Sequence, residues 1–243
     1  MIDLHSHILP GLDDGSSSLE ESLQMARLAV ESGIKTVVAT PHCTYERTAE
    51  VRSAVRLMRR ALEEFEIPLR LYAGMEIFGI EETTALLQKG QLITLNHSRY
   101  PLIEFDFESD GEEETYILQS VVRAGYRPVV AHPERYRYVQ HDPELINQWH
   151  EMGCLFQINR GSLLGRFGRG AQNMAMELIG RGFAAVVSSD AHGAGTRTQW
   201  MKDVKKLIIE EFSREAAEAL LHRNPGKILK NEEIPLIRPE WFE

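Results

Sequence analysis

The hydrophobic pattern of the chain alternates between short apolar runs and longer amphipathic stretches. Each run is apolar without alternation, which is typical of a strand covered on both faces in a parallel sheet. The pattern predicts seven strands: one that begins at residue 2, and others at 36–40, 69–74, 100–104, 128–131, 155–158 and 184–188.

The stretches between these runs have one apolar face at helical spacing, and they predict helices at about 19–31, 46–65, 112–125, 142–152, 169–181 and 199–222. Alternating strands and helices indicate an α/β fold with right-handed connections. We expect a distorted, closed or nearly closed (β/α)7 barrel, with a doubly wound open sheet as the alternative. The barrel is favoured because polar residues end most of the strands, and in a barrel those ends meet at one mouth.

Length and composition restrict the classes of protein. A chain of 243 residues with 43% hydrophobic content is expected to form one domain over residues 1–243. It has no secretory leader at its start and no apolar run of about 18 residues, so we expect a cytoplasmic protein without membrane insertion.

The net charge of −9 argues against a nucleic-acid partner. Two cysteines, Cys43 and Cys154, fit a reducing compartment and are expected to be inert core residues.

Histidines and carboxylates gather at the predicted strand ends. His5 and His7 are two residues apart and point to one face of the first strand, where they can chelate a metal ion. A lone His-x-His motif or a lone Glu after a strand is often a packing or capping feature, but many such residues recur here. The candidates are His5, His7, Asp14, His42, Glu76, Glu104, His132, Asp190 and His192. A mixed nitrogen and oxygen set of this size suits two or three Mn, Fe or Zn ions.

These motifs resemble those of the polymerase and histidinol phosphatase (PHP) family of metal-dependent phosphoesterases. The resemblance covers essentially the whole chain. The matching motifs are His5-Ser-His7, Thr40-Pro-His42, the strand ends at Glu76 and Glu104, His132-Pro-Glu-Arg135 and Ser189-Asp-Ala-His192. Within the family, the chain looks most like the manganese-dependent protein tyrosine phosphatases encoded with bacterial capsule and exopolysaccharide genes.

The resemblance implies a PHP-type distorted barrel of seven strands, a trinuclear metal site and Mn²⁺ as the ion. It implies that all nine candidates are metal ligands and that Arg135 and Arg197 contact phosphate. The implied substrate is the tyrosine-rich tail of a bacterial tyrosine kinase.

The chemistry is consistent with this expectation. Three divalent ions and two arginines exceed the charge of four carboxylates, so the mouth would attract an anion such as a phosphate monoester. A metal-bridging hydroxide can attack phosphorus, since metals lower the pKa of bound water toward about 7. Tyrosinate is a good leaving group, and His132 or His192 could assist its departure. A small-molecule phosphatase such as histidinol phosphatase, and a nucleic-acid-processing or structural barrel, remain alternatives.

Some signals are discounted. Cys154 and Arg160 have the Cys-x5-Arg spacing of cysteine-dependent tyrosine phosphatases, but the residues between them read as a buried strand rather than a phosphate-binding turn. The glycine- and arginine-rich stretch 160–170 is predicted to be a mobile loop at the rim. Four further histidines are expected on the surface: His97, His141, His150 and His222.

Overall fold

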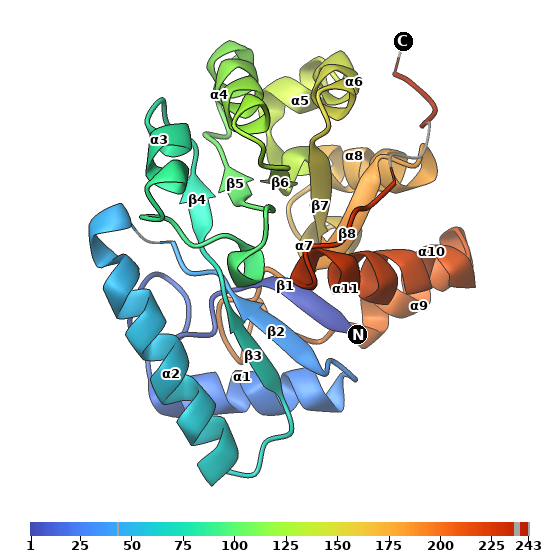
Figure 1. The fold of residues 1–243 in the computed structure, drawn as a ribbon. Helices are drawn as coiled ribbons and strands as arrows, with labels where there is room; N and C mark the ends of the chain where they lie inside the picture. Colours follow the sequence, from blue (N-terminus) through green and yellow to red (C-terminus); the bar gives the residue numbers. More distant parts are fainter. Residues whose placement is uncertain (43, 236–238, 243) are drawn as a thin grey trace.

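The computed structural model describes residues 1–42, 44–235 and 239–242, and Cys43 lies outside them. Its strands are parallel and form two sheets, in the orders β1-β2-β3 and β4-β5-β6-β7-β8 (Figure 1). Their bounds are β1 Ile2–Ser6, β2 Thr36–Ala39, β3 Arg70–Ala73, β4 Glu76–Phe78, β5 Leu102–Glu104, β6 Val129–Ala131, β7 Leu155–Asn159 and β8 Ala184–Ser188.

Backbone contacts join the two sheets at both seams. At one seam, Asp190 N–H donates to His5 O and His7 N–H donates to Ala191 O, both at 2.9 Å. At the other seam, an isolated bridge pairs His42 with Glu76. The first seam lies near the carboxyl ends of β1 and β8, and the second joins the segment after β2 to the first residue of β4. The expected distorted barrel is confirmed.

The short strand β4 is an addition to the predicted pattern, which placed Glu76 at the end of the third strand. The chain leaves β3 at Gly74 and enters the second sheet at Glu76. Gly74 lies tightly against β2, because an added Cβ would be only 2.8 Å from Val38 Cγ1. The close approach requires glycine there and marks the step between the sheets.

Helices cover the outside of the barrel (Figure 1). Their bounds are α1 Leu19–Glu31, α2 Thr48–Glu64, α3 Thr83–Gln88, α4 Glu112–Arg123, α5 Arg137–His141, α6 Glu144–Glu151, α7 Arg160–Leu163, α8 Arg169–Gly180, α9 Lys202–Glu211, α10 Arg214–Glu218 and α11 Asn224–Leu229. Short turns of other helix types are η1 Tyr45–Arg47, η2 Leu95–His97, η3 Pro133–Arg135 and η4 Ala219–Arg223. None of the helices in these ranges combines the length and apolarity needed to cross a membrane.

The prediction of one helix over 199–222 is wrong. The chain leaves helical geometry at Phe212, and the side chain of Ser213 then accepts a hydrogen bond from Ala216 N–H at the start of α10. This is an ordinary N-cap, in which a serine side chain satisfies a backbone donor that has no partner in its own helix. The apolar periodicity continues across the cap, which is why the pattern alone did not reveal the break.

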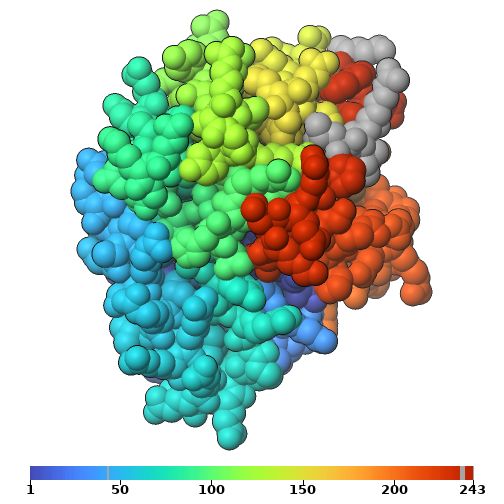
Figure 2. Space-filling model, viewed as in Figure 1, coloured from blue at the N-terminus to red at the C-terminus, as the bar shows by residue number. Residues whose placement is uncertain are grey.

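Two apolar clusters fill the molecule. The larger one lies between the strands and the surrounding helices, and the smaller one includes Leu4, Val38, Leu102, Val129 and Leu155 from the barrel interior. Ile228 of α11 and Ile234 belong to the smaller cluster, so the C-terminal segment closes one end of the barrel. In Figure 2 the red atoms of this segment cover the middle of the face shown. The functional groups are therefore restricted to the opposite end.

Candidate metal and phosphate site

Most of the side chains predicted to form the site lie near the carboxyl ends of the strands or in the loops that follow, whereas Glu76 begins β4. Two of them begin a sharp change of direction: His132 directly follows β6 with φ of 33°, and Asp190 follows β8 with φ of 49°. Non-glycine residues rarely adopt this left-handed region, and they persist there only when the surroundings hold them. The backbone is therefore bent at two of the positions that aim side chains into the mouth.

Glu76 lies at the centre of the site, and its side chain is buried. Its Oε2 is 3.0 Å from His5 Nε2, 3.1 Å from His7 Nε2 and 3.4 Å from His42 Nε2. Its Oε1 is 2.9 Å from His132 Nε2. Glu104 Oε1 is 3.4 Å from the same His132 nitrogen. One buried carboxylate therefore contacts four of the five predicted histidines.

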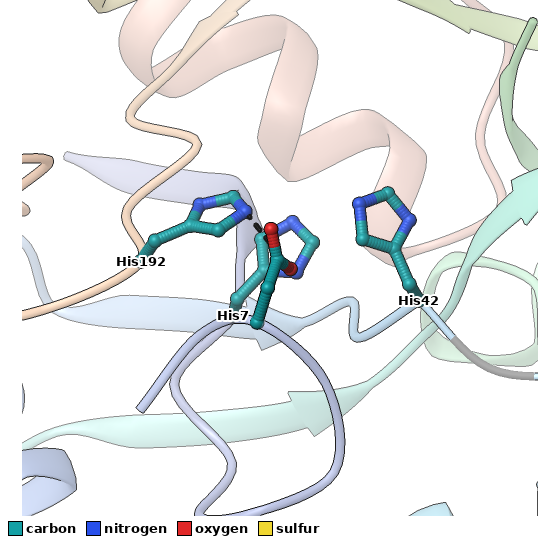
Figure 3. Close-up of side chains that lie close together, drawn as sticks. His7, His42 and His192 are labelled. Carbon is teal, nitrogen blue, oxygen red and sulfur yellow. Dashed lines mark ion pairs between the residues drawn. The ribbon is translucent and has the colours of Figure 1, made fainter. Parts of the chain in front are cut away.

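Asp190 and His192 bring the remaining ligand candidates to the other side of the cluster. Asp190 Oδ1 is 3.4 Å from His5 Nε2 and from His192 Nδ1, and His192 Nε2 is 3.4 Å from Asp14 Oδ1. Figure 3 shows His7, His42 and His192 turned toward a common space. The structure thus brings all nine predicted ligand residues together.

Three groups within this cluster have the spacing of metal sites. In each group the ligand atoms lie within 4.8 Å of one another. The groups are His5, His7, Glu76 and Asp190; His7, Asp14, His42 and His192; and His42, Glu76 and Glu104. His7, His42 and Glu76 each belong to two groups, so the arrangement suits ions that share ligands.

Residues outside the predicted set orient the first two histidines. Gln157 Oε1 accepts from His5 Nδ1 at 2.8 Å, and Asp13 Oδ2 accepts from His7 Nδ1 at 2.6 Å. Because these partners are acceptors, Nδ1 of each ring is the donor, and both Nε2 atoms face the cluster. Such outer partners fix the tautomer and direction of metal-binding histidines. Sequence reasoning missed both Gln157 and Asp13.

The pKa values of the site show that its carboxylates favour a nearby positive charge. Burial opposes protonation of His5, but the Glu76 and Asp190 carboxylates outweigh it and raise the pKa of His5 to about 9. Burial together with the charge of Glu76 raises the pKa of Glu104 to about 8. Burial lowers the pKa of His132 to about 4, so this ring is neutral near pH 7. The cluster is short of cations and offers neutral imidazole nitrogen to any that bind.

The two oxygens of Asp190 are in different surroundings. Oδ2 accepts hydrogen bonds from Asn159 Nδ2 and from Arg197 Nη2, while Oδ1 is buried and has no hydrogen-bond partner. Oδ1 instead lies within 3.5 Å of the Nε2 atoms of His5 and His7. A buried carboxylate oxygen without a hydrogen bond is costly unless a cation neutralises its charge. The donor set therefore fits divalent metal ions.

Arg135 and Arg197, predicted to contact phosphate, lie beside this cluster. Arg135 Nη1 is 3.5 Å from Asp190 Oδ2, and its guanidinium carbon lies 4.7 Å from the centroid of the Phe107 ring and 4.2 Å from that of Phe167. Arg197 also approaches Phe167, at 5.8 Å. The two aromatic rings hold Arg135 between them through cation–π contacts. Sequence reasoning missed both rings.

The stretch 160–170 is only partly the loop that was predicted, because residues 164–168 connect two helices and the rest is helical. Arg160–Leu163 forms α7, and Arg160 is buried and paired with Asp203 through Nη2 and Oδ2. Phe167 packs on Gly161, where an added Cβ would be 2.5 Å from the ring. This segment is folded against the barrel, and it supplies the ring that covers Arg135.

Cys154 is not a nucleophile. Burial raises the pKa of its thiol to about 12, which removes the thiolate at neutral pH, and Arg160 is engaged with Asp203. The prediction that Cys154 lies in the core is confirmed, and its inertness stays a prediction.

One of the four other histidines was placed wrongly. His150 is buried and lies 5.4 Å from the Phe183 ring and 5.9 Å from that of Trp241. His97, His141 and His222 are exposed as predicted.

Comparison with known proteins gives a consistent result. Residues 1–230 match the family "Capsular polysaccharide synthesis, CpsB/CapC". The chain is 36% identical to tyrosine-protein phosphatase YwqE of Bacillus subtilis (strain 168), over 96% of this chain and 93% of the relative. It is 31% identical to tyrosine-protein phosphatase CpsB of Streptococcus agalactiae serotype V, over 96% and 100% of the two chains.

A solved structure matches the whole fold. It belongs to a set of crystal structures of YwqE from Bacillus subtilis and CpsB from Streptococcus pneumoniae, which are described as unique metal-dependent tyrosine phosphatases. The superposition gives a TM-score of 0.94 at 35% identity and covers 100% of both chains.

Proposed function

The chain belongs to the CpsB/CapC family of capsular polysaccharide synthesis proteins, and we propose that it is a metal-dependent protein tyrosine phosphatase. The observation that carries the proposal is the buried oxygen Asp190 Oδ1, which has no hydrogen-bond partner and faces the Nε2 atoms of His5 and His7. A cation-binding centre beside two arginines is suited to a phosphate monoester.

The residues that would hold the ions are His5, His7, Asp14, His42, Glu76, Glu104, His132, Asp190 and His192. When bound, divalent ions act as Lewis acids and lower the pKa of water toward about 7, which provides a nucleophile. Glu76 and Asp190 keep the ligand nitrogens of His5 and His7 turned inward. The shared ligands favour two or three ions, and we propose Mn²⁺ as the ion.

Arg135 and Arg197 would bind the phosphoryl oxygens. Both side chains touch Asp190 and keep part of their surface exposed, at 19% and 32%. They can therefore reach a ligand from fixed starting positions. A guanidinium remains charged at all physiological pH values and offers paired N–H donors, which match two oxygens of a phosphoryl group.

Departure of tyrosinate needs little help, because its conjugate acid has a pKa of about 10. His132 and His192 lie close enough to assist, but burial lowers the pKa of each ring to about 4, so both are neutral near pH 7 and carry no acidic proton to donate. His132 is held by Glu76 through Nε2, and His192 Nδ1 lies 3.0 Å from the carbonyl oxygen of Asp190. We therefore assign both a role as metal ligands rather than the expected role as proton donors.

The proposed substrate is a phosphotyrosine protein, namely the tyrosine-rich tail of a bacterial tyrosine kinase that regulates capsule or exopolysaccharide synthesis. The similarity to two tyrosine-protein phosphatases over nearly their full lengths supports this substrate class. We further propose a cytoplasmic location and a single catalytic domain over residues 1–243.

The test compares turnover of phosphotyrosine peptides and histidinol phosphate by protein loaded with Mn²⁺ and by protein treated with chelator. We expect turnover of the peptides only with metal, and elemental analysis should find two or three ions per chain. A strong preference for histidinol phosphate would replace this function with that of a small-molecule phosphatase. Cys154→Ser should retain activity, and loss of turnover in that folded variant would contradict the metal mechanism.

A further inference from the structure

A cavity of about 570 Å³ opens beside the metal and phosphate site. Two of its walls, His42 and Glu76, are also ligand candidates. Its other walls are mostly apolar and come from η1, β4, α3 and the chain after α3: Tyr45, Phe78, Ile80, Thr83, Leu86 and Leu92. The cavity is therefore continuous with the reaction centre, but none of the chemistry proposed above uses its apolar part.

The cavity concentrates exposed apolar surface. Tyr45, Phe78 and Ile80 are 42%, 53% and 38% exposed, and they are three of the seven large hydrophobic side chains that are exposed in the described parts of the chain. Isolated exposed hydrophobic residues are ordinary, but several that meet in one hollow beside a reaction centre indicate a binding surface.

The cavity lies where it can contact a substrate that is bound at the metal and phosphate site. The arginines follow β6 and β8, whereas the cavity lies between the ends of β2 and β4, in another sector of the mouth. Glu76 spans the two sectors, since it contacts His132 on one side and His42 on the other. When the arginines and the metal ligands hold a phosphoryl group, the cavity therefore lies beside that group. The rest of the substrate can then reach into the cavity.

The size and charge of the cavity indicate what kind of group it can bind. A space of roughly 150 Å³ is enough for a benzene-sized ring, so the cavity has room for more than the ring of one phosphotyrosine. Two further charged side chains line the cavity, Glu46 and Arg47. Arg47 is paired with Glu50 at 2.9 Å, and Glu46 is hydrogen-bonded to Thr44 and Tyr45, which leaves the apolar walls as the main recognition surface. We propose that the cavity binds an apolar side chain adjacent to the phosphotyrosine of a peptide substrate. This inference rests on the proposed phosphatase function and names its specificity subsite.

The test uses a phosphotyrosine peptide in which one leucine, in an otherwise Ser/Gly background, is moved through the two positions on each side of the phosphotyrosine. With the metal-loaded enzyme, we expect kcat/KM for one leucine position to exceed that for the leucine-free peptide by about tenfold, the scale of burying one such side chain. Phe78→Ala and Ile80→Ser should reduce this ratio to within about twofold of one. Turnover of p-nitrophenyl phosphate, which has no flanking residue, should not change in either variant.

Phe65→Ala is the matched control, because Phe65 is 48% exposed and does not line the cavity. It should keep both the leucine preference and p-nitrophenyl phosphate turnover. Absence of any leucine preference in the wild-type enzyme would overturn the subsite. An equal loss of p-nitrophenyl phosphate turnover in Phe78→Ala would also overturn it, since the cavity would then bind the reacting ring.

Fluorescence anisotropy of the labelled phosphopeptides separates this inference from the proposed function. If neither p-nitrophenyl phosphate nor any peptide is turned over, the phosphatase function is refuted. Leucine-dependent binding that Phe78→Ala weakens at least fivefold would still support the subsite. Binding that is independent of leucine would refute the subsite as well.

Discussion

The metal cluster has a buried half and an exposed half, and the two differ in how the protein holds them. In the buried half, the side chains of His5, His7, Glu76 and Asp190 are at most 1% exposed. In the exposed half, the side chains of Asp14 and His42 are 65% and 38% exposed. The buried ligands are charged groups that water cannot solvate, so their arrangement is unfavourable without cations. The exposed ligands can exchange metal contacts for water.

This difference indicates separate tasks. The buried half is fixed by outer partners such as Gln157 and Asp13, and it is suited to permanent ion binding. The exposed half faces the entrance and, through His42, adjoins the apolar cavity. We therefore expect mutations to act more strongly the deeper the side chain lies.

The largest effect is expected for Asp190→Ala in the buried half. This change removes the oxygen that faces His5 and His7 and also the acceptor for Arg197 and Asn159. Turnover should fall to the background, with less bound metal by elemental analysis and an unchanged circular dichroism spectrum. Appreciable turnover by the metal-loaded variant would show that the buried half is dispensable.

The next largest effect concerns the arginines. Arg135→Ala or Arg197→Ala should lower kcat/KM by about 10²–10³, the scale of losing one preorganised charge-stabilising donor. Metal content should not change, because neither side chain belongs to the metal-binding groups. Parallel measurements of kcat/KM, bound metal and Tm on each variant test this. A lower Tm with near-normal kcat/KM would reduce the arginines to structural partners of Asp190.

An intermediate effect is expected for Gln157→Leu, which removes the acceptor of His5 Nδ1–H. Loss of such an outer partner typically weakens metal affinity by about 10–100-fold. Metal titration of turnover should show this shift, and saturating metal should restore most of kcat. Gln148→Leu on the exposed side of α6 is the control and should titrate like the wild type.

The sequence predicted the site better than its surroundings. Each of the nine ligand candidates follows or ends an apolar run, or lies in the loop after one, so the signal is local and parallel strands bring those ends together. Gln157 lies inside a strand, two residues after Leu155 on the side that faces the barrel interior. Its role depends on which face of β7 is the interior, and only the closed barrel decides that.

The other errors have the same origin. Phe167 lies in a glycine- and arginine-rich stretch whose composition resembles a loop, and its role comes from tertiary contact with Arg135. His150 was expected on the surface because it lies on a helix away from the strand ends, but Trp241, far along the chain, packs against it. Residues whose environment is built by distant segments cannot be placed from local pattern.

The smallest effect is expected for Asp14→Asn in the exposed half. Water already solvates this carboxylate, and its contribution to ion binding is screened by a high dielectric and by salt. At saturating Mn²⁺ we expect kcat/KM within about tenfold of the wild-type value. The remaining loss should appear as a higher Mn²⁺ requirement than that of the wild type, and this difference should become smaller at higher ionic strength, because salt screens the charge that the wild-type carboxylate contributes. Titrations of turnover with Mn²⁺ at two salt concentrations, with Asp190→Ala measured alongside, give the comparison directly. If Asp14→Asn lowers kcat/KM as much as Asp190→Ala does at saturating metal, the burial of a ligand does not determine how much it contributes to turnover. The exposed half is then as essential to the chemistry as the buried one.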